Sequence, residues 1–264
     1  MNHIAIFDGD KGGVGKSFAC RCYIDLLLSR KNPPLQVSPI DCDPRNPDIY
    51  RTFARDCQVA KIFLGDEEGW AKLFKYITEA KEKNFAISLP AGIGVMADQW
   101  AAIFKKSLAQ SDNSILTFWV MGKDADSRNL FKTAIAKGSI IADRTVVILN
   151  NFFNETAGSD VYYEWRMSQI RRKFLDKGGK EIILPKLATR IVQSLDYINE
   201  ANEPAIVPFH QSNEVFKNNA FDKNVISNWM EEVEKVFAPI LENESLFSYT
   251  SDITTNEKEK KNKE

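Results

Sequence analysis

The chain has 264 residues, 44% of them hydrophobic, so it can bury one sizeable core, and we expect a single main domain. Its 35 lysine and arginine residues nearly balance its 36 aspartate and glutamate residues, so any nucleic-acid contact must come from a local basic patch. No apolar stretch is long enough to cross a bilayer, and the short apolar run near the start does not form a signal peptide. We therefore expect a soluble, cytoplasmic protein.

Strands and helices alternate among the predicted elements. Apolar runs typical of buried strands occupy residues 4–7, 35–40, 59–64, 85–89, 115–121, 145–149 and 181–184. Helical spacing occupies residues 18–28, 68–83, 96–109, 127–137, 161–175, 192–200 and 224–241. Pro239 is expected to end or kink the last helix. This order predicts an α/β fold with a mainly parallel, doubly wound sheet, which binds ligands at the carboxyl ends of its strands.

The end of the chain has a different composition. Residues 254–264 are almost entirely Glu, Lys, Asn and Thr, which cannot bury apolar surface. We therefore divide the chain into one domain, residues 1–245, and a disordered tail, residues 246–264. Neither His3 nor His210 has metal-ligand spacing. The cysteines also lack it and are interpreted as reduced thiols: Cys20, Cys22, Cys42 and Cys57.

A glycine-rich segment, residues 9–17, connects the first strand to the first helix. Its sequence is Gly-Asp-Lys-Gly-Gly-Val-Gly-Lys-Ser. Such a turn aims several backbone N–H groups at one point, and the helix N-terminus adds the positive end of its dipole, which together suit the phosphates of a nucleotide. In this arrangement Lys16 neutralises phosphate charge and the Ser17 hydroxyl holds Mg²⁺.

The segment differs from the standard phosphate loop. The standard pattern, Gly-x4-Gly-Lys-Ser/Thr, ends correctly at Ser17, but Asp10 replaces its opening glycine and Lys11 follows. Lys-Gly-Gly-Val-Gly-Lys-Ser is the deviant Walker A motif, and the chain resembles the ParA/MinD family of P-loop ATPases. The resemblance implies ATP and Mg²⁺ as cofactors. It also implies nucleotide contacts from these residues: Gly12, Gly13, Val14, Gly15, Lys16, Ser17 and Phe18.

Lys11 has its own implied role. In the family that the chain resembles, the upstream lysine reaches across a dimer interface to the partner's nucleotide, so the resemblance implies an ATP-dependent homodimer. Two facing nucleotides concentrate negative charge, and a lysine from each side lowers that electrostatic cost. The alternative is a solvated loop lysine.

A second motif, Asp41-Cys42-Asp43-Pro44, closes the second predicted strand. Alternate residues of an extended segment face the same way, so Asp41 and Asp43 share a side. The same Asp-x-Asp-Pro follows the second strand in the ParA/MinD family. By that resemblance Asp43 positions the attacking water, as a catalytic residue beside Lys16 and Lys11, and Asp41 belongs to the outer metal shell. An Asx-turn before Pro44 is compatible with both roles.

The chain departs from the family at the Walker B position. The family's strand usually ends in Asp-x-Pro, whereas Ser88-Leu89-Pro90-Ala91-Gly92 stands here, so Ser88 replaces the aspartate. A hydroxyl can bond a magnesium-bound water but adds no charge. Either Asp41 compensates and turnover is slow, or the protein binds nucleotide as a switch and hydrolyses little.

Base recognition is expected late in the chain. Asn150 ends a predicted strand, and an amide that both donates and accepts matches the adenine edge. By resemblance Asn150 is the first choice and Asn151 the second, and the loop that ends at Pro185 lies against the base. Without the resemblance, an asparagine after a strand is an ordinary turn residue.

Two late segments suggest partners. A basic surface for nonspecific DNA binding comes from Arg166, Arg171, Arg172 and Lys173, with Lys177, Lys180, Lys186 and Arg190 nearby. The alternative for this surface is a solvated helix face. The last helix is amphipathic, but its polar face carries several glutamates that anionic lipid would repel, so we expect it to pack on the core and not on a membrane.

Together these residues predict a dimerising ATPase of the ParA/MinD type, acting in plasmid or DNA partition or mobilisation through nonspecific DNA or an adaptor protein, with nucleoid association following from DNA binding. The alternative is a weakly hydrolysing switch that positions a protein partner and binds no DNA, which Ser88 and the near-zero net charge favour. A metabolic P-loop ligase is disfavoured, because that chemistry needs no bridging lysine.

Overall fold

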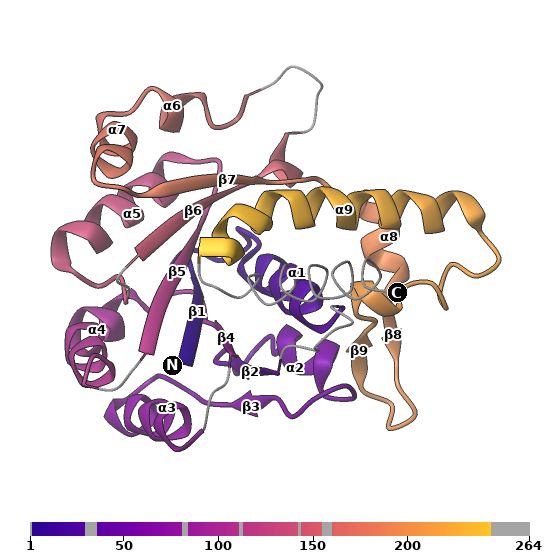
Figure 1. The fold of residues 1–264 in the computed structure, drawn as a ribbon, viewed down its shortest axis with the longest axis horizontal. Coiled ribbons are helices and arrows are strands. Elements are labelled where there is room, and N and C mark those ends of the chain that lie inside the picture. The colour runs from indigo at the N-terminus through magenta and orange to yellow at the C-terminus, as the bar shows by residue number, and fades with distance from the viewer. Residues whose placement is uncertain are drawn as a thin grey trace, which may run out of the picture.

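The computed structural model describes residues 2–29, 36–80, 84–110, 113–141, 144–154 and 160–243. They contain a seven-stranded parallel sheet in the order β3-β2-β4-β1-β5-β6-β7 (Figure 1). The strands are β1 (Asn2–Asp8), β2 (Val37–Asp41), β3 (Ala60–Lys61), β4 (Asn84–Ser88), β5 (Asn113–Met121), β6 (Arg144–Asn150) and β7 (Lys180–Leu184). The predicted parallel α/β sheet is confirmed, although β3 is much shorter than the predicted 59–64 strand.

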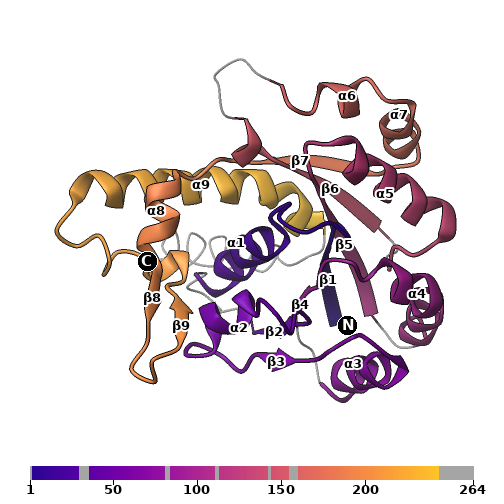
Figure 2. The same cartoon turned by 180° about the vertical axis from the view of Figure 1, so that it is seen from behind.

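Helices cover both faces of the sheet (Figures 1 and 2). One face carries α1 (Lys16–Leu28), α2 (Asp48–Phe53), α8 (Thr189–Ser194) and α9 (Ala220–Asn243). The other face carries α3 (Glu67–Glu79), α4 (Gly94–Leu108), α5 (Ala125–Lys137), α6 (Tyr163–Arg166) and α7 (Gln169–Asp176). Among the described residues, none of these helices combines the length and the apolar character that a membrane crossing requires.

Aromatic packing fixes α1, which begins at the glycine-rich loop. Phe7 of β1 stacks on Phe118 of β5 with ring centroids 4.8 Å apart, and Tyr23 of α1 lies 5.6 Å from each ring. Phe237 of α9 closes the cluster at 5.5 Å from Phe118. Each such pair contributes about 0.5–1.5 kcal/mol beyond burial, so α1 is held rigidly beneath the loop. The expected packing of the last helix on the core is confirmed.

The structure corrects the basic helix predicted at residues 161–175. It is two helices, α6 and α7, with a break at Met167 and Ser168. The Ser168 hydroxyl accepts a hydrogen bond from Arg171 N at 3.1 Å and so caps α7. Serine is a preferred N-cap, and this local bond competes with continuation of the preceding helix.

The structure also corrects the helix predicted at residues 192–200. The helix α8 ends at Ser194, and the chain continues as a hairpin of β8 (Asp196–Ile198) and β9 (Pro204–Ile206). Asn202 provides the turn with a φ of 60°, a left-handed conformation that asparagine tolerates. Short 3₁₀ segments η1 (Asn151–Phe153) and η2 (Phe209–Gln211) complete the described elements.

Smaller differences concern the ends of elements. The first helix starts at Lys16, two residues before the predicted start, and α9 continues through Pro239 to Asn243. A proline in the helix interior removes one backbone hydrogen bond but does not end this helix. The predicted tail, residues 246–264, lies outside the described residues, as do residues 35 and 81–83 at the ends of two predicted elements.

Candidate functional site

The loop between β1 and α1 has the backbone that the glycine-rich motif requires. Gly13 and Gly15 have φ angles of 73° and 97°, in the left-handed region that glycine enters at no steric cost. A Cβ added to Gly15 would lie 2.3 Å from Asn150 Nδ2, so a larger residue does not fit there. The loop is therefore held close to the end of β6.

Lys16 is buried within this loop. It is only 8% exposed, and its Nζ donates to the Lys11 carbonyl oxygen at 2.6 Å. Burial lowers the pKa of Lys16, and the nearby carboxylates of Asp8, Asp10 and Asp43 oppose that change. An ammonium that is hydrogen-bonded to a loop carbonyl can exchange that acceptor for a phosphate oxygen, which is the chemistry predicted for Lys16.

Lys11 points to α5 of its own chain. Its Nζ lies 2.7 Å from Asp124 and 3.6 Å from Asp126, at the N-terminal end of that helix. The hydrogen bond to Asp124 raises the pKa of Lys11. The predicted bridge to a second subunit would therefore require Lys11 to exchange these carboxylates for a partner's phosphates.

Asp10 ties the loop to the segment after β4, a role that sequence reasoning missed. Its side chain accepts from Gly94 N at 2.8 Å, and its carbonyl oxygen accepts from Gly92 N at 3.0 Å. Asp10 has a φ of 46°, and a Cβ on Gly94 would lie 2.4 Å from Asp10 Oδ2. The aspartate that breaks the standard motif thus joins two segments 84 residues apart.

Asp41 and Asp43 lie at the end of β2, and both bind backbone amides. Asp41 Oδ1 accepts from Asp43 N and its Oδ2 accepts from Tyr50 N, each at 3.0 Å. Burial raises the pKa of Asp41 to about 6. Asp43 Oδ1 accepts from Arg45 N at 2.9 Å and from Asn46 N at 3.0 Å, which is the Asx-turn considered from the sequence. Asp41 thereby anchors the first turn of α2, a helix that the sequence did not predict.

Ser88 is the last residue of β4, the strand that lies between β1 and β2 in the sheet. In the sheet register it pairs with Phe7 of β1 and Asp41 of β2, and it is 1% exposed. Since partners in a parallel register face the same side, the Ser88 hydroxyl and the Asp41 carboxylate share the face that carries α1. The position at which the resemblance implies a Walker B aspartate is thus beside a carboxyl group whose pKa is raised by burial.

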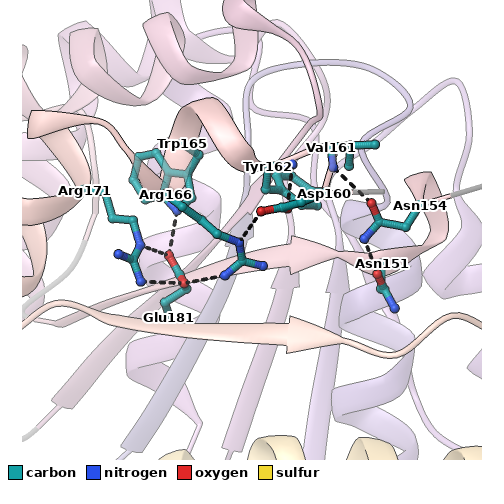
Figure 3. Close-up of polar contacts among 9 residues, drawn as sticks. All are labelled: Asn151, Asn154, Asp160, Val161, Tyr162, Trp165, Arg166, Arg171 and Glu181. Atoms are coloured by element: carbon teal, nitrogen blue, oxygen red, sulfur yellow. Dashed lines mark hydrogen bonds and ion pairs between the residues drawn. The ribbon is translucent and has the colours of Figure 1, made fainter. Parts of the chain in front are cut away.

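A small apolar pocket of about 210 Å³ adjoins the loop. Asn150 is buried at its edge, where its Nδ2 donates to Val14 O and its Oδ1 accepts from Phe152 N, both at 3.1 Å. The second choice, Asn151, instead bonds to Asn154 (Figure 3). The pocket is lined by Gly13, Gly15, Phe18, Asn150, Phe152, Pro185, Leu187 and Val192.

This pocket brings together residues that were predicted separately, from the loop, from β6 and from the segment after β7. Phe152, Leu187 and Val192 were missed, because apolar residues after strands carry no motif. Each polar group of the Asn150 amide still has one hydrogen-bonding position beyond the bond it makes. The pocket is apolar enough for a base, and its glycines, Gly13 and Gly15, also belong to the glycine-rich loop that was predicted to bind phosphates.

Two of the four main residues predicted for DNA binding, Arg166 and Arg171, pair with carboxylates (Figure 3). Glu181 of β7 accepts from Arg171 Nε at 2.9 Å and from Trp165 Nε1 at 2.6 Å, and Arg166 Nε bonds to Asp160 at 2.9 Å. Farther along, Arg190 pairs with Asp222. Within the described ranges, Arg172 and Lys173 form no ion pair and are exposed.

The histidines and cysteines form no metal site in the described part of the chain, where no group of three potential ligands occurs. His210 instead bonds through Nδ1 to the buried Asp25 at 2.5 Å. A magnesium ion would therefore rely on the half-buried Ser17 hydroxyl and on nucleotide oxygens, which fits the few protein ligands that this ion takes.

A comparison with known proteins finds a relative by sequence. The chain is 25% identical over 189 residues to Protein MobD of Acidithiobacillus ferrooxidans, covering 71% of this chain and 79% of that protein. No family model matches the chain. A nucleotide-binding protein of Archaeoglobus fulgidus, solved in complex with ADP, aligns with a TM-score of 0.45 and 16% identity over 72% of this chain and 84% of that chain.

Proposed function

We propose that this protein is an ATP-dependent switch, a P-loop ATPase that binds MgATP at the β1–α1 loop and dimerises through the same edge of the sheet. The proposal rests on one observation: the glycine-rich loop and the apolar pocket beside it share two glycines. Gly13 and Gly15 belong to the phosphate loop and also line the apolar pocket beside Asn150. A triphosphate near Lys16 and a base in the pocket would fit one nucleotide.

Different residues would bind the phosphates, hold the metal ion and position the water for hydrolysis. Lys16 would exchange the Lys11 carbonyl for phosphate oxygens, and Ser17 would hold Mg²⁺, which supplies positive charge to the phosphates. Asp43, whose charge acts on Lys16, would orient the attacking water, and Asp41 would belong to the outer metal shell. Since Ser88 adds no charge beside Asp41, we expect slow hydrolysis.

Dimerisation is supported by apolar side chains that follow the carboxyl ends of the strands. Phe63 after β3 is 59% exposed, Val95 at the start of α4 is 68% exposed, and Phe152 after β6 is 44% exposed. Exposed large apolar residues on one edge are typical of a surface that another protein covers. Lys11 lies on the same edge, so a second copy would bring it near the partner's nucleotide.

Lys11→Ala tests the switch. This variant is expected to bind MgATP with unchanged heat in calorimetry but to remain monomeric by light scattering, whereas the wild type becomes dimeric with MgATP. The matched control is Lys123→Ala, an exposed lysine on the same side that forms no ion pair in the described ranges. Dimers that persist in Lys11→Ala refute the bridging role, and absence of nucleotide heat in the wild type refutes the whole proposal.

For the cellular task we propose plasmid or DNA mobilisation or partition, with contacts to DNA from Arg172 and Lys173. The sequence similarity to Protein MobD supports this proposal. A second candidate, a protein-positioning switch without DNA binding, is favoured by the carboxylates that pair with Arg166, Arg171 and Arg190. Binding of duplex DNA with MgATP across a salt series separates them. Retention at low salt that Arg172→Ala/Lys173→Ala reduces supports the first, and no retention supports the second.

A further inference from the structure

An open apolar groove of about 490 Å³ lies between α5 and α7, away from the nucleotide site. Its floor and walls include Ile135 of α5, Ile140 before β6, and Ile170 and Phe174 of α7. Ile135 is 44% exposed, although it lies beside these apolar neighbours. Apolar side chains that remain exposed within a concave surface indicate a place where another chain can bury them.

The walls of the groove are rigid. Phe174 packs edge-to-face on Phe131 of α5, with ring centroids 5.4 Å apart, and Phe131 packs in turn on Trp165. Glu181 holds this unit to β7 through Trp165 and Arg171, as Figure 3 shows. A groove built on paired rings and a shared carboxylate is preformed, so a ligand need not order it.

Lysines supply the charge that the described residues bring to the groove. Lys132, Lys173 and Lys177 line it, and no acidic side chain is found in the lining that the described residues form. All three lysines are exposed, and none of them forms an ion pair with another described residue. A small polar ligand would find little else to bond here, because Thr145 is the one uncharged polar side chain in the lining. The chemistry that complements the groove is therefore an apolar ridge flanked by carboxylates.

The groove lies at the edge of the sheet opposite to the phosphate loop. Thr145 is near the start of β6, whereas Asn150 at the end of β6 lines the base pocket. Because all seven strands are parallel, starts and ends of strands lie on opposite edges. A ligand in the groove would leave the nucleotide site and its dimer edge free.

We propose that the α5–α7 groove is a docking site for an acidic amphipathic helix of a partner protein. The partner's apolar face fills the space between Ile135, Ile170 and Phe174, and its glutamate or aspartate side chains face the three lysines. This is the helix-in-groove mode of recognition, in which apolar anchors supply affinity and rim charges supply orientation and association rate. The groove is separate from the proposed nucleotide site and can be tested without nucleotide, and it shares Lys173 with the proposed DNA contact.

The test uses the full chain and an 18-residue fluorescent peptide with leucines at helical i, i+3, i+4 and i+7 positions and glutamates elsewhere. We expect saturable binding by anisotropy, with Kd below about 100 μM. The groove variant Lys132→Glu/Lys173→Glu/Lys177→Glu should weaken binding at least about tenfold, and 0.3 M salt should weaken wild-type binding. The matched control, Lys217→Glu/Lys223→Glu/Lys235→Glu, changes the net charge equally at exposed positions elsewhere and should bind normally.

Ile135→Ser tests the apolar contribution and should weaken binding about threefold to tenfold. A peptide of the same composition, with its leucines scattered around the helix, should bind far more weakly. The circular dichroism spectrum and the urea stability should be unchanged in every groove variant, which shows that they fold.

Several results would overturn the proposal. The proposal fails if the peptide shows no saturable binding. It also fails if the peptide with scattered leucines binds as tightly as the amphipathic peptide, or if the control variant weakens binding as much as the groove variant does. Duplex DNA binding that is lost in the groove variant, without peptide binding, would assign the surface to nucleic acid. A nucleotide-independent dimer that the groove variant abolishes would assign it to a second copy of this chain.

Discussion

The edge of the sheet that carries the glycine-rich loop and the α5–α7 groove both contain lysines, but the lysines differ in what they contact. Lys16 bonds to a loop carbonyl, and Lys11 bonds to Asp124 and Asp126. In the groove, Lys132 and Lys173 have no carboxylate partner among the described residues. A lysine held by an internal acceptor is already oriented, and a ligand must replace that acceptor. An unpaired lysine attracts any anion of suitable shape, so its selectivity must come from the apolar walls beside it.

The largest expected effect separates the two regions directly. Lys16→Ala should lower MgATP affinity by at least about a hundredfold, because it removes a buried charge-assisted contact to phosphate. Lys132→Ala, the same substitution in the groove, should leave MgATP affinity unchanged. Isothermal calorimetry measures both variants, and circular dichroism checks that both fold. Equal nucleotide affinity of Lys16→Ala and wild type would place the nucleotide elsewhere.

The next effect concerns the pH dependence of stability at the phosphate-loop edge. Burial raises the pKa of Asp41 to about 6 from 3.8, so between these values the folded chain holds a proton that the unfolded chain lacks. Stability from this group therefore rises as the pH falls from 6 toward 4 and is absent above 6, by up to about 3 kcal/mol. The difference in urea stability between wild type and Asp41→Asn should favour the wild type more at pH 4.5 than at pH 7. Asp43→Asn serves as the control, and a difference that is independent of pH contradicts the prediction.

Next to the groove, loss of the Glu181 carboxylate should lower the stability of the folded chain. Glu181→Gln should lower the free energy of unfolding by about 1–2 kcal/mol, because Arg171 loses a partly buried charge-assisted pair that holds α7. Glu164→Gln, at an exposed position of α6, should change it little. Urea denaturation measures both variants. If Glu181→Gln is as stable as Glu164→Gln, the rings alone hold the groove wall.

The smallest effect should come from releasing Lys11. Asp124 also caps α5 by accepting from Ser127 N at 3.0 Å, and asparagine is an equally good cap. Asp124→Asn should therefore keep the helix and weaken only the ion pair, so that the dimer forms at an ATP concentration about twofold to fivefold lower. Light scattering across an ATP titration measures this, with Asp160→Asn as a distant control. A higher ATP requirement would mean that Asp124 assists the dimer.

Local patterns predicted the parts of this protein that depend on neighbours in sequence. The alternation of apolar runs and helical spacing was sufficient for the parallel sheet, and the glycines and Lys16 were sufficient for the shape of the loop, since their conformations are set within a few residues. Asn150 and Pro185 line one pocket because each lies at the carboxyl end of a strand, and these ends meet at one edge of the sheet.

The features that were missed depend on contacts between distant residues. The bond of Asp10 to Gly94 and the pairing of Arg171 with Glu181 leave no periodic signal, so Asp10 was seen only as a missing glycine and Arg171 only as a surface cation. The capping of α7 by Ser168 was visible in principle, since serine precedes the helix, but the basic periodicity obscured it. The hairpin after Ser194 likewise depends on packing against α2.

One helix and one strand run between the two regions. The helix α5 begins beside Lys11 and contributes Ile135 to the groove near its other end, about 15 Å away at 1.5 Å per residue. The strand β6 covers a similar span from Thr145 to Asn150. If a helix docked in the groove prefers one nucleotide state, linkage requires that nucleotide affinity change by the same factor when the helix binds. The helix α5 and the strand β6 would then be the elements that directly connect helix binding in the groove to nucleotide binding at the loop.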